Sequence, residues 1–196
     1  MFFRIFFSLI FFLVSLNADA LLQSLSQEQK QWLKEHPVIT AQNESDYIPI
    51  NFNKSGYPQG LSIDYIDSIA KKLGIKIEYV TGKTWDKYLD MAKQKRIDII
   101  LNVVKTDKRD DYLKFTKPYL KTYPFIYANK NNSIKNLKDL QGKRLAIPRG
   151  YYFEELFEKN YPNIKLVKVK NNLEALKVVS TNQADATVGM SSTFEH

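Results

Sequence analysis

The sequence contains no cysteine and only two histidines, and these absences exclude several kinds of site. Without cysteine there is no disulfide framework, no thiolate metal site and no lipid-anchor residue after the leader. His36 and His196 are too few and too far apart in the sequence to suggest a metal site or a histidine-dependent catalytic pair. We therefore expect no metal and no other cofactor, and we interpret both histidines as solvated surface residues.

Segregated charge is also absent. The formal net charge is +8, but the 29 basic residues are scattered among 21 acidic ones and form no stripe. We therefore expect no nucleic-acid partner. The apolar content is 44% and the aromatic content is 13%, so 196 residues suffice for one large core or two small ones.

Long apolar runs are absent after the first twenty residues. Residues 1–20 contain a single cation, Arg4, then an apolar run and the small-x-small sequence Ala18-Asp19-Ala20, a pattern typical of a cleavable signal peptide. The run of about a dozen apolar residues is shorter than the roughly twenty that span a membrane. We predict an exported chain that starts near Leu21 and meets the membrane only through its leader.

Strand and helix patterns alternate along the rest of the chain, which is typical of α/β folds with mostly parallel sheets. Ser26 and Gln29 have the spacing of a capping box, and they predict an amino-terminal helix within residues 21–37 that packs through Trp32 and Leu33. The predicted strands are 38–41, 75–79, 97–104, 144–147, 164–169 and 184–190, and the predicted longer helices are 63–73, 84–92, 151–160 and 172–179.

The chain is predicted to form two lobes, residues 38–122 and 123–196. The segment 121–129 is extended, aromatic and interrupted by proline, and we interpret it as a crossover between them. The stretches KRIDIILNVV and NQADATVGMS both place an aspartate at the start of a strand, a quasi-repeat that is expected of two similar lobes.

The stretch 97–125 combines a buried strand, a polar turn and a Pro-aromatic segment, and we expect it to form a ligand site. Thr106 can cap a short helix and so leave Arg109 near the carboxyl end of the strand, where ligands bind in open α/β sheets. The planar guanidinium matches a carboxylate, so the expected ligand is a small organic acid or amino acid. A surface arginine that pairs with Asp110 or Asp111 is the alternative.

These residues resemble the signature of the bacterial extracellular solute-binding proteins of family 3, in the runs DIILNVVKTDKR and KFTKPY. The variant with Asn102 and with Phe-Thr in the second run is similar to the periplasmic Venus-flytrap domains of BvgS-type sensor kinases. The resemblance extends over residues 25–194. It implies a two-lobed periplasmic-binding-protein fold that closes on a ligand by hinge motion, without catalysis. Family members continue beyond this chain's end, so we expect an incomplete second lobe.

The resemblance also implies the residues that contact the ligand. They are Glu44, Tyr47, Trp85, Asn102, Val104, Arg109, Gly150, Tyr151, Tyr152 and Met190. The rings of Tyr47 and Trp85 would line the pocket, and the turn at Gly150 would offer backbone N–H groups to the ligand's carboxylate. In the alternative interpretations, Tyr47 only packs in a loop, Trp85 belongs to the core, and Gly150 only makes a turn.

Met190 and Val104 depart from the family pattern, which has an acid at the first position and often serine at the second. An ammonium group that enters a cleft without an acidic partner loses hydration that it cannot replace. We therefore predict that a carboxylate without an α-ammonium, or a bulkier aromatic acid, binds better than standard amino acids. In the alternative, Met190 only packs under the cleft and Glu44 supplies the charge.

The resemblance leaves the partner open between an ABC transporter permease and a sensor-kinase module. A second class of function is an enzyme on the same scaffold, similar to cyclohexadienyl dehydratases or to lytic transglycosylases. The sequence has no convincing paired carboxylates or buried base for such chemistry, so we expect no enzymatic activity. A non-functional fragment is the third class.

Overall fold

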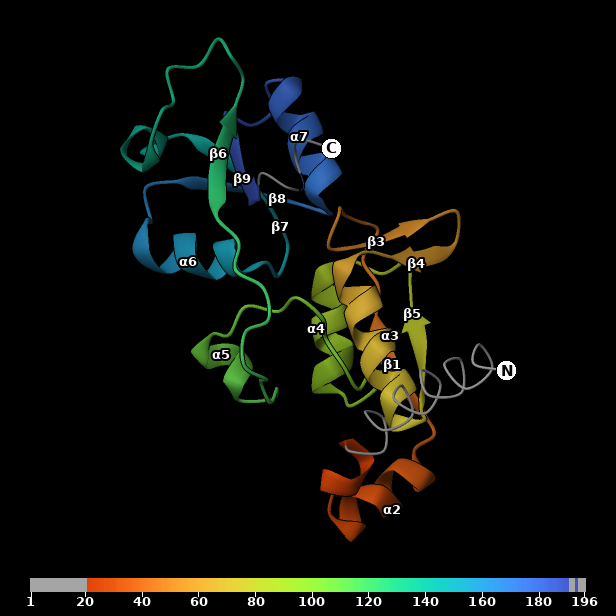
Figure 1. The fold of residues 1–196 in the computed structure, drawn as a ribbon. Coiled ribbons are helices and arrows are strands. Elements are labelled where there is room, and N and C mark those ends of the chain that lie inside the picture. Colours follow the sequence, from red (N-terminus) through yellow and green to blue (C-terminus); the bar gives the residue numbers. More distant parts are fainter. Residues whose placement is uncertain (1–20, 191–192, 194–196) are drawn as a thin grey trace, which may run out of the picture.

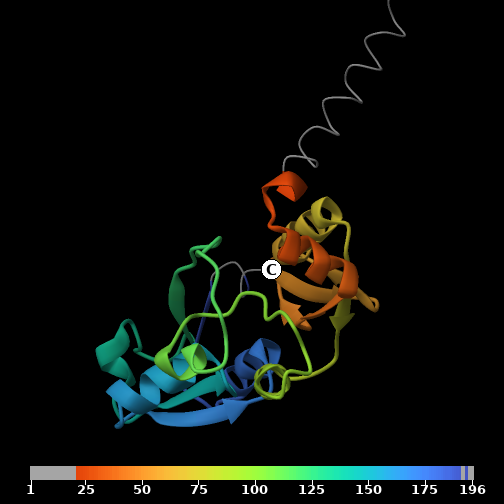
Figure 2. The same ribbon diagram turned by 90° about the horizontal axis from the view of Figure 1, so that it is seen from below.

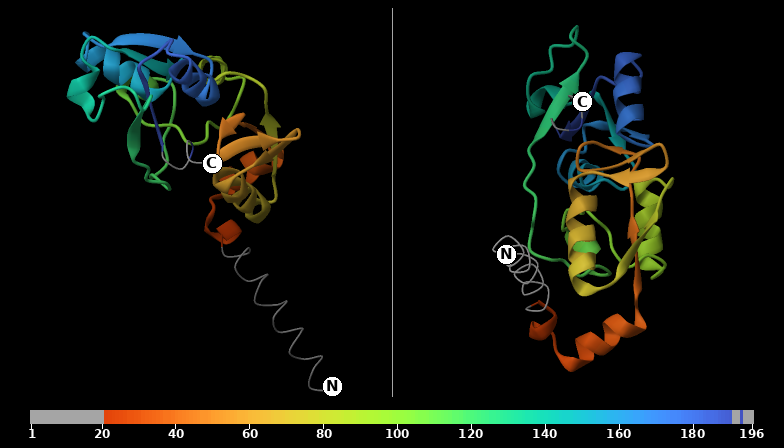
Figure 3. Two further views of the ribbon diagram at one scale, coloured as in Figure 1. Left: turned by 90° about the horizontal axis from the view of Figure 1, so that it is seen from above. Right: turned by 45° about the vertical axis from the view of Figure 1, so that its right-hand side comes forward.

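The computed structural model of the protein describes residues 21–190 and Thr193, which form two α/β parts joined by extended segments (Figure 1). The N-terminal part comprises residues 38–113 and the C-terminal part comprises residues 124–190. Figure 3 shows a long extended segment that leaves the N-terminal part and leads into strand β6. Among the described residues, no helix is long and apolar enough to span a membrane. The predicted signal peptide and His196 lie outside the described residues.

Helix α2 (Gln27–Glu35) precedes the N-terminal part. Ser26 and Gln29 form the predicted capping box, but none of the residues of α2 is buried. Trp32 is 48% exposed and stacks on the ring of His36, with 4.2 Å between the ring centroids. The predicted packing role of this helix is therefore wrong, because its aromatic residue contacts its own last turn and not a sheet. His36 is exposed, as predicted.

The N-terminal part is built on two parallel strands with helices packed beside them. Its elements are β1 (Val38–Gln42), β2 (Asp46–Tyr47), β3 (Asn51–Lys54), β4 (Tyr57–Gln59), α3 (Leu61–Leu73), β5 (Lys76–Val80), α4 (Trp85–Lys93) and α5 (Asp107–Asp110). Strands β1 and β5 pair in parallel register, and α3 ends at Gly74 in the left-handed conformation, as predicted. Thr84 is the N-cap residue of α4, but its side chain makes no capping hydrogen bond.

Strands β2, β3 and β4 form an antiparallel unit that the sequence analysis does not predict. Buried side-chain amides connect this unit to the end of β1. Asn43 Nδ2 donates to Asn51 Oδ1 at 2.8 Å, and Asn51 Nδ2 donates to Gln42 Oε1 at 3.2 Å. All three side chains are fully buried. Because polar side chains occupy these positions, the strands lack the alternation of apolar residues that would identify them in the sequence.

Residues 97–104 were predicted to form a buried strand, and this prediction is wrong in part. Ile97 and Leu101 are buried, but the only ladder contact in the segment is an isolated parallel bridge between Ile99 and Ala41. Asn102 has a φ of +60°, a left-handed conformation that turns the chain out of the extended direction. The chain then reaches α5, where the Thr106 side chain caps the backbone N–H of Arg109 at 3.3 Å, as predicted.

The C-terminal part is a four-stranded sheet in the order β6-β9-β7-β8. Its elements are β6 (Pro124–Ala128), the 3-10 helix η1 (Leu137–Leu140), β7 (Arg144–Pro148), α6 (Tyr152–Asn160), β8 (Lys165–Val169), α7 (Asn172–Ser180) and β9 (Ala186–Met190). Strand β7 is parallel to β8 and β9, whereas β6 runs antiparallel to β9. The sheet is therefore mixed, with its antiparallel strand at the edge where the chain enters.

Helices cover both faces of this sheet because successive side chains of a strand point to opposite faces. Leu145 and Ile147 pack in one cluster with Phe153 and Phe157 of α6. Ala146, between them, belongs to the opposite cluster with buried residues of α7. Figure 2 shows the two helices and the blue strands of this layer beside the orange and yellow N-terminal part.

The two aspartates of the quasi-repeat occupy equivalent positions. Asp98 Oδ2 accepts a hydrogen bond from the backbone N–H of Thr40 in β1 at 2.8 Å. Asp185 Oδ2 accepts one from the backbone N–H of Arg144 in β7 at 2.7 Å. Each aspartate therefore ties the start of its own segment to the neighbouring strand.

Candidate functional site

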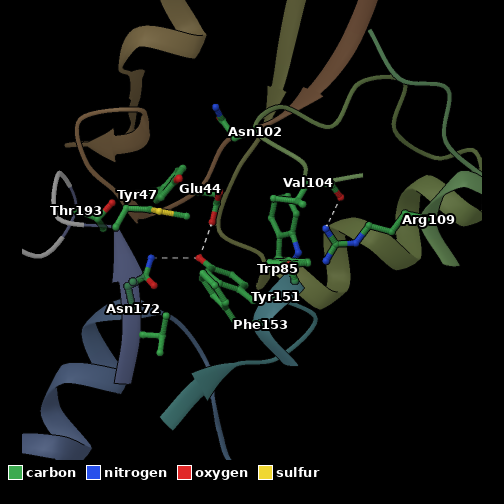
Figure 4. Close-up of a pocket in the computed structure, with 14 residues that line it drawn as sticks. Glu44, Tyr47, Trp85, Asn102, Val104, Arg109, Tyr151, Phe153, Asn172 and Thr193 are labelled. Carbon is green, nitrogen blue, oxygen red and sulfur yellow. Dashed lines mark hydrogen bonds between the residues drawn. The ribbon is translucent and has the colours of Figure 1, made fainter. Parts of the chain in front are cut away.

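A pocket lies between the N-terminal and C-terminal parts (Figure 4). It is lined by Glu44, Tyr47, Trp85, Asn102, Val104, Arg109, Tyr151, Tyr152, Phe153, Asn172, Val188, Gly189, Met190 and Thr193. Its cavity volume is about 70 Å³, roughly half that of an engineered apolar cavity that holds benzene. The free space between these side chains is therefore small.

The pocket brings together every predicted ligand-contacting residue except Gly150. Sequence reasoning missed five lining residues, namely Phe153, Asn172, Val188, Gly189 and Thr193. Three of them adjoin predicted residues: Phe153 follows Tyr152, and Val188 and Gly189 precede Met190 in β9. Asn172 is the first residue of α7, and its asparagine pair with Asn171 was interpreted only as a helix cap.

Glu44 follows β1 and is the only acidic residue among the fourteen that line the pocket. It is 7% exposed, and its Oε2 accepts a hydrogen bond from the Tyr151 hydroxyl at 3.0 Å. That hydroxyl in turn accepts one from Asn172 Nδ2 at 3.2 Å. Burial raises the pKa of Glu44 to about 8, with a smaller contribution from Asp46. The carboxyl group is therefore mostly protonated at neutral pH and links the two parts as a neutral group.

Arg109 is the only basic residue among the fourteen described residues that line the pocket, and 1% of its surface is exposed. Its Nη1 donates to the Val104 carbonyl and its Nη2 donates to the Gly150 carbonyl, both at 2.8 Å. Burial lowers the pKa of the guanidinium, which stays protonated in proteins. The alternative of an exposed arginine paired with its aspartate neighbours is wrong, because Arg109 is buried and Asp110 pairs with Lys105 at 2.8 Å.

The turn at Gly150 presents its carbonyl to the N-terminal part. The carbonyl accepts hydrogen bonds from Arg109 Nη2 and from Trp85 Nε1 at 3.0 Å. The N–H of Gly150 donates to the Glu154 side chain, and the N–H of Tyr151 donates to the Pro148 carbonyl. Of the two N–H groups that were expected to hold the anion, those of Tyr151 and Tyr152, the Tyr151 group is therefore occupied by an acceptor of the protein itself. The role of the Tyr152 group stays a prediction.

Glycine is required at position 150 because α4 approaches closely. The residue has a φ of +76°, and a Cβ there would lie 3.1 Å from Asp86 Cα and 3.3 Å from the Trp85 ring. A side chain would push α4 away from the turn and lengthen the Trp85 hydrogen bond. The glycine thus keeps the two parts in contact beside the pocket.

The aromatic residues of the pocket come from both parts. Trp85 is 7% exposed and meets the Tyr151 ring edge-on, at 5.9 Å between centroids. Trp85 is therefore both a buried residue and a pocket residue, so the two interpretations of it are compatible. Tyr47 is half-buried, and burial raises the pKa of its hydroxyl to about 12.

Asn102 is oriented by its neighbours. Its Nδ2 donates to Ser62 Oγ at 2.6 Å and to the Tyr119 hydroxyl at 3.0 Å. Its Oδ1 is buried without a hydrogen-bond partner among the described residues. Val104, which lines the pocket nearby, offers no side-chain donor, and its carbonyl is already bonded to Arg109. This part of the pocket wall therefore offers a ligand the Asn102 Oδ1 as a free acceptor, and the Val104 side chain offers it no donor.

Comparison with known proteins identifies the family. The model of the bacterial extracellular solute-binding proteins, family 3, matches residues 39–192. The chain belongs to this family. This finding confirms the resemblance read from the runs around Asn102 and Arg109, and it makes the pocket a feature of a solute-binding scaffold.

Curated relatives include both sensors and transport receptors. The chain is 28% identical over 174 residues to the virulence sensor protein BvgS of Bordetella pertussis, which covers 88% of this chain and 14% of that protein. It is 32% identical over 148 residues to a probable histidine-binding protein of Campylobacter jejuni, which covers 73% of this chain and 56% of that protein. The chain thus spans about half or less of the length of these relatives.

Solved structures of similar fold include an ancestral arginine-binding protein bound to arginine. The match has a TM-score of 0.74 at 27% identity and covers 82% of this chain and 73% of that chain. The ancestral amino acid-binding protein AncCDT-1, a precursor of cyclohexadienyl dehydratase, matches with a TM-score of 0.72 at 28% identity over 83% of this chain and 74% of that chain. The protein therefore has the α/β periplasmic-binding-protein fold.

Proposed function

We propose that the chain binds a small carboxylate-bearing solute, an amino acid or a related organic acid, in the pocket between its two parts. The carrying observation is Arg109, a buried guanidinium that lines the pocket and lies at the junction of the two parts. A guanidinium of this kind binds a carboxylate through paired N–H donors. The aromatic residues around it would enclose the rest of the ligand.

We propose that residues 38–122 and 123–196 act as two lobes that close on the ligand. The extended segment that leads into β6 (Figure 3) is the expected hinge, because it runs from one part to the other and contains no helix or strand between α5 and β6. The contact from Tyr151 to Glu44, which bridges the pocket, would form on closure and break on opening. The function so defined needs no covalent chemistry.

The expected ligand lacks an α-ammonium group, or it is a bulkier aromatic acid. Met190 ends β9 at the pocket without a charge, and Glu44 is the only lining acid. Because the pKa of Glu44 is raised to about 8, the ionised form that an ammonium needs is costly at neutral pH. Two relatives are named for the binding of an amino acid. Tight binding of a standard amino acid by this chain would therefore contradict the expected ligand class.

The proposed setting is the periplasm, reached through the leader. The binding event would be read by an ABC transporter permease or by a sensor-kinase module, and the relatives include proteins of both kinds. The resemblance around Asn102 favours the sensor, whereas the predicted signal peptide favours the transport receptor.

A dehydratase is the second candidate, and the state of Glu44 favours it. A dehydratase needs a carboxylic acid that is protonated at neutral pH and lies in the same pocket as the arginine, and Glu44 meets this description. A solved relative is named as a precursor of cyclohexadienyl dehydratase. Incubation with a 4-hydroxycyclohexadiene-1-carboxylic acid that carries a second substituent at C1 would test this candidate. Loss of its carboxylate as CO2 together with its protonated hydroxyl as water gives an aromatic product with a new ultraviolet absorbance.

A thermal-shift screen tests the proposed function. The twenty amino acids and a set of simple mono- and dicarboxylates are added to the wild type, to Arg109→Lys and to Arg96→Lys. We expect at least one carboxylate to raise the melting temperature of the wild type and of Arg96→Lys, whose arginine is exposed. The shift should be smaller for Arg109→Lys, because lysine lacks the planar fork of donors. Equal shifts for all three proteins would contradict the role of Arg109.

A further inference from the structure

Arg109 already has an anionic neighbour in the C-terminal part. Its Nε lies 3.5 Å from Glu155 Oε1, and the exposed fractions of the two side chains are 2% and 27%. The Nε group has no hydrogen-bond partner among the described residues, so the pair is an ion pair at a distance slightly too long for a hydrogen bond. The contact joins α5 of one part to α6 of the other.

Glu155 differs from the other acids of α6. Glu154 and Glu158 both pair with Lys168, at 2.6 Å and 2.8 Å. Among the described residues, the ion pair recorded for Glu155 is the one with Arg109. The first turn of α6 therefore directs one carboxylate to Lys168 and the next to the guanidinium of Arg109.

The contacts of Arg109 use the groups that a ligand would need. Nε and Nη2 form one edge of the guanidinium, and an arginine binds a carboxylate through two parallel N–H groups on such an edge. Here Nε faces Glu155, and Nη2 donates to the Gly150 carbonyl. Nη1 donates to the Val104 carbonyl. A carboxylate that takes the Nε–Nη2 edge must therefore displace both groups of the C-terminal part.

We propose that Glu155 is an internal competitor for Arg109, which stands in for the ligand's carboxylate when the pocket is empty and sets the affinity for the ligand. The proposal rests on the proposed function, because it assumes a carboxylate ligand at Arg109. In the empty protein the Glu155–Arg109 pair is one of the contacts that hold the two parts together. An incoming carboxylate must break this pair before it binds, so its apparent affinity is reduced by the fraction of molecules in which the pair is formed.

The first experiment measures the affinity of Glu155→Gln by calorimetry, with the carboxylate that gives the largest thermal shift for the wild type. Glutamine keeps the shape of the side chain but removes its charge, so we expect about tenfold tighter binding, which corresponds to about 1.4 kcal/mol. Glu158→Gln is the matched control, because Glu158 lies one turn further along α6 and pairs with Lys168. Its affinity should equal that of the wild type.

The same change in an Arg109→Ala background locates the effect. If Glu155 acts through Arg109, Glu155→Gln should leave the affinity of Arg109→Ala unchanged. Unchanged or weaker binding by the single variant Glu155→Gln overturns the proposal, since weaker binding would mean that Glu155 assists closure on the ligand. An equal gain in both backgrounds also overturns it, because the gain would then reflect only the net charge near the pocket.

A second measurement does not depend on a ligand. Small-angle X-ray scattering of the ligand-free protein should give a larger radius of gyration for Glu155→Gln than for the wild type and Glu158→Gln, because one of the contacts that hold the parts together is lost. An equal radius for the three proteins contradicts the stand-in role. If no carboxylate binds to the wild type or to Glu155→Gln, the proposed function fails, whereas the scattering result still decides whether the pair helps to hold the parts together.

Discussion

Glu44 is the buried acid of the pocket, and its replacement by glutamine should remove a pH-dependent cost of folding. Burial raises the pKa of its carboxyl group from 4.5 to about 8. Between these values the folded chain holds a proton that the unfolded chain releases, so the free energy of unfolding falls as the pH rises. The contribution of Glu44 is greatest below pH 4.5 and is lost by about pH 8. Glutamine is uncharged at every pH and should not show this fall.

The size of the effect follows from the pKa. One pKa unit corresponds to about 1.4 kcal/mol, so the change between pH 4.5 and pH 7 amounts to about 3 kcal/mol. A residue that is 7% exposed is shielded from most of the water that would reduce this value. For a domain of this size, about 3 kcal/mol corresponds to roughly 6 to 12 °C in melting temperature.

The assay is thermal unfolding followed by circular dichroism at intervals from pH 4.5 to pH 8. The wild type should lose more of its melting temperature over this range than Glu44→Gln, because the other titrating groups are common to both proteins. Glu78→Gln is the control, since Glu78 is exposed on β5 and should follow the wild type. Parallel profiles for the wild type and Glu44→Gln would refute the reasoning.

Three further predictions concern single residues. Gly60→Ala should destabilise the fold by about 2 to 4 kcal/mol in chemical denaturation, because a Cβ at this positive-φ residue would lie 2.5 Å from the Ile50 carbonyl oxygen. Asp185→Asn should cost about 1 kcal/mol in the same assay, since it weakens the bonds to the backbone and guanidinium of Arg144. Trp85→Ala and Tyr47→Ala should each weaken binding by about 1 to 3 kcal/mol in calorimetry, and only Trp85→Ala should also lower the melting temperature strongly, because Trp85 is buried.

Local signals were sufficient to predict the helices and most strands. The capping box at Ser26, the cap at Thr106 and the left-handed residue Gly74 each depend on neighbours within a few positions, so the sequence carries them directly. The quasi-repeat at Asp98 and Asp185 also holds, because each aspartate bonds the adjacent strand. The elements that failed depend on distant partners.

The antiparallel unit β2-β3-β4 is an example of such a failure. Buried asparagine and glutamine side chains connect it to the end of β1, and their partners are set by the fold and not by any period in the sequence. The segment 97–104 has the β-branched composition of a strand, but Asn102 turns the chain after one bridge. In both cases tertiary contacts override the local pattern.

The sequence predicted most of the residues that line the pocket, but it did not predict their protonation states or hydrogen bonds. Family motifs identified nine of the fourteen lining residues, but they could not give the state of each group. The raised pKa of Glu44 results from burial in the folded chain, where its carboxyl group bonds Tyr151, and the contacts of Arg109 depend on Gly150 and Glu155. These contacts join residues more than forty positions apart, so the sequence alone carries no signal for them.

The most direct test of the central claim is a calorimetric titration of the wild type and Arg109→Ala with the carboxylate selected by the screen. We predict that the loss of the guanidinium weakens binding by about 2 to 5 kcal/mol, because the ligand's carboxylate is then desolvated without a charged partner. Arg96→Ala should bind like the wild type, and circular dichroism should show that all three proteins are folded. Equal affinity of folded Arg109→Ala and the wild type would contradict the account.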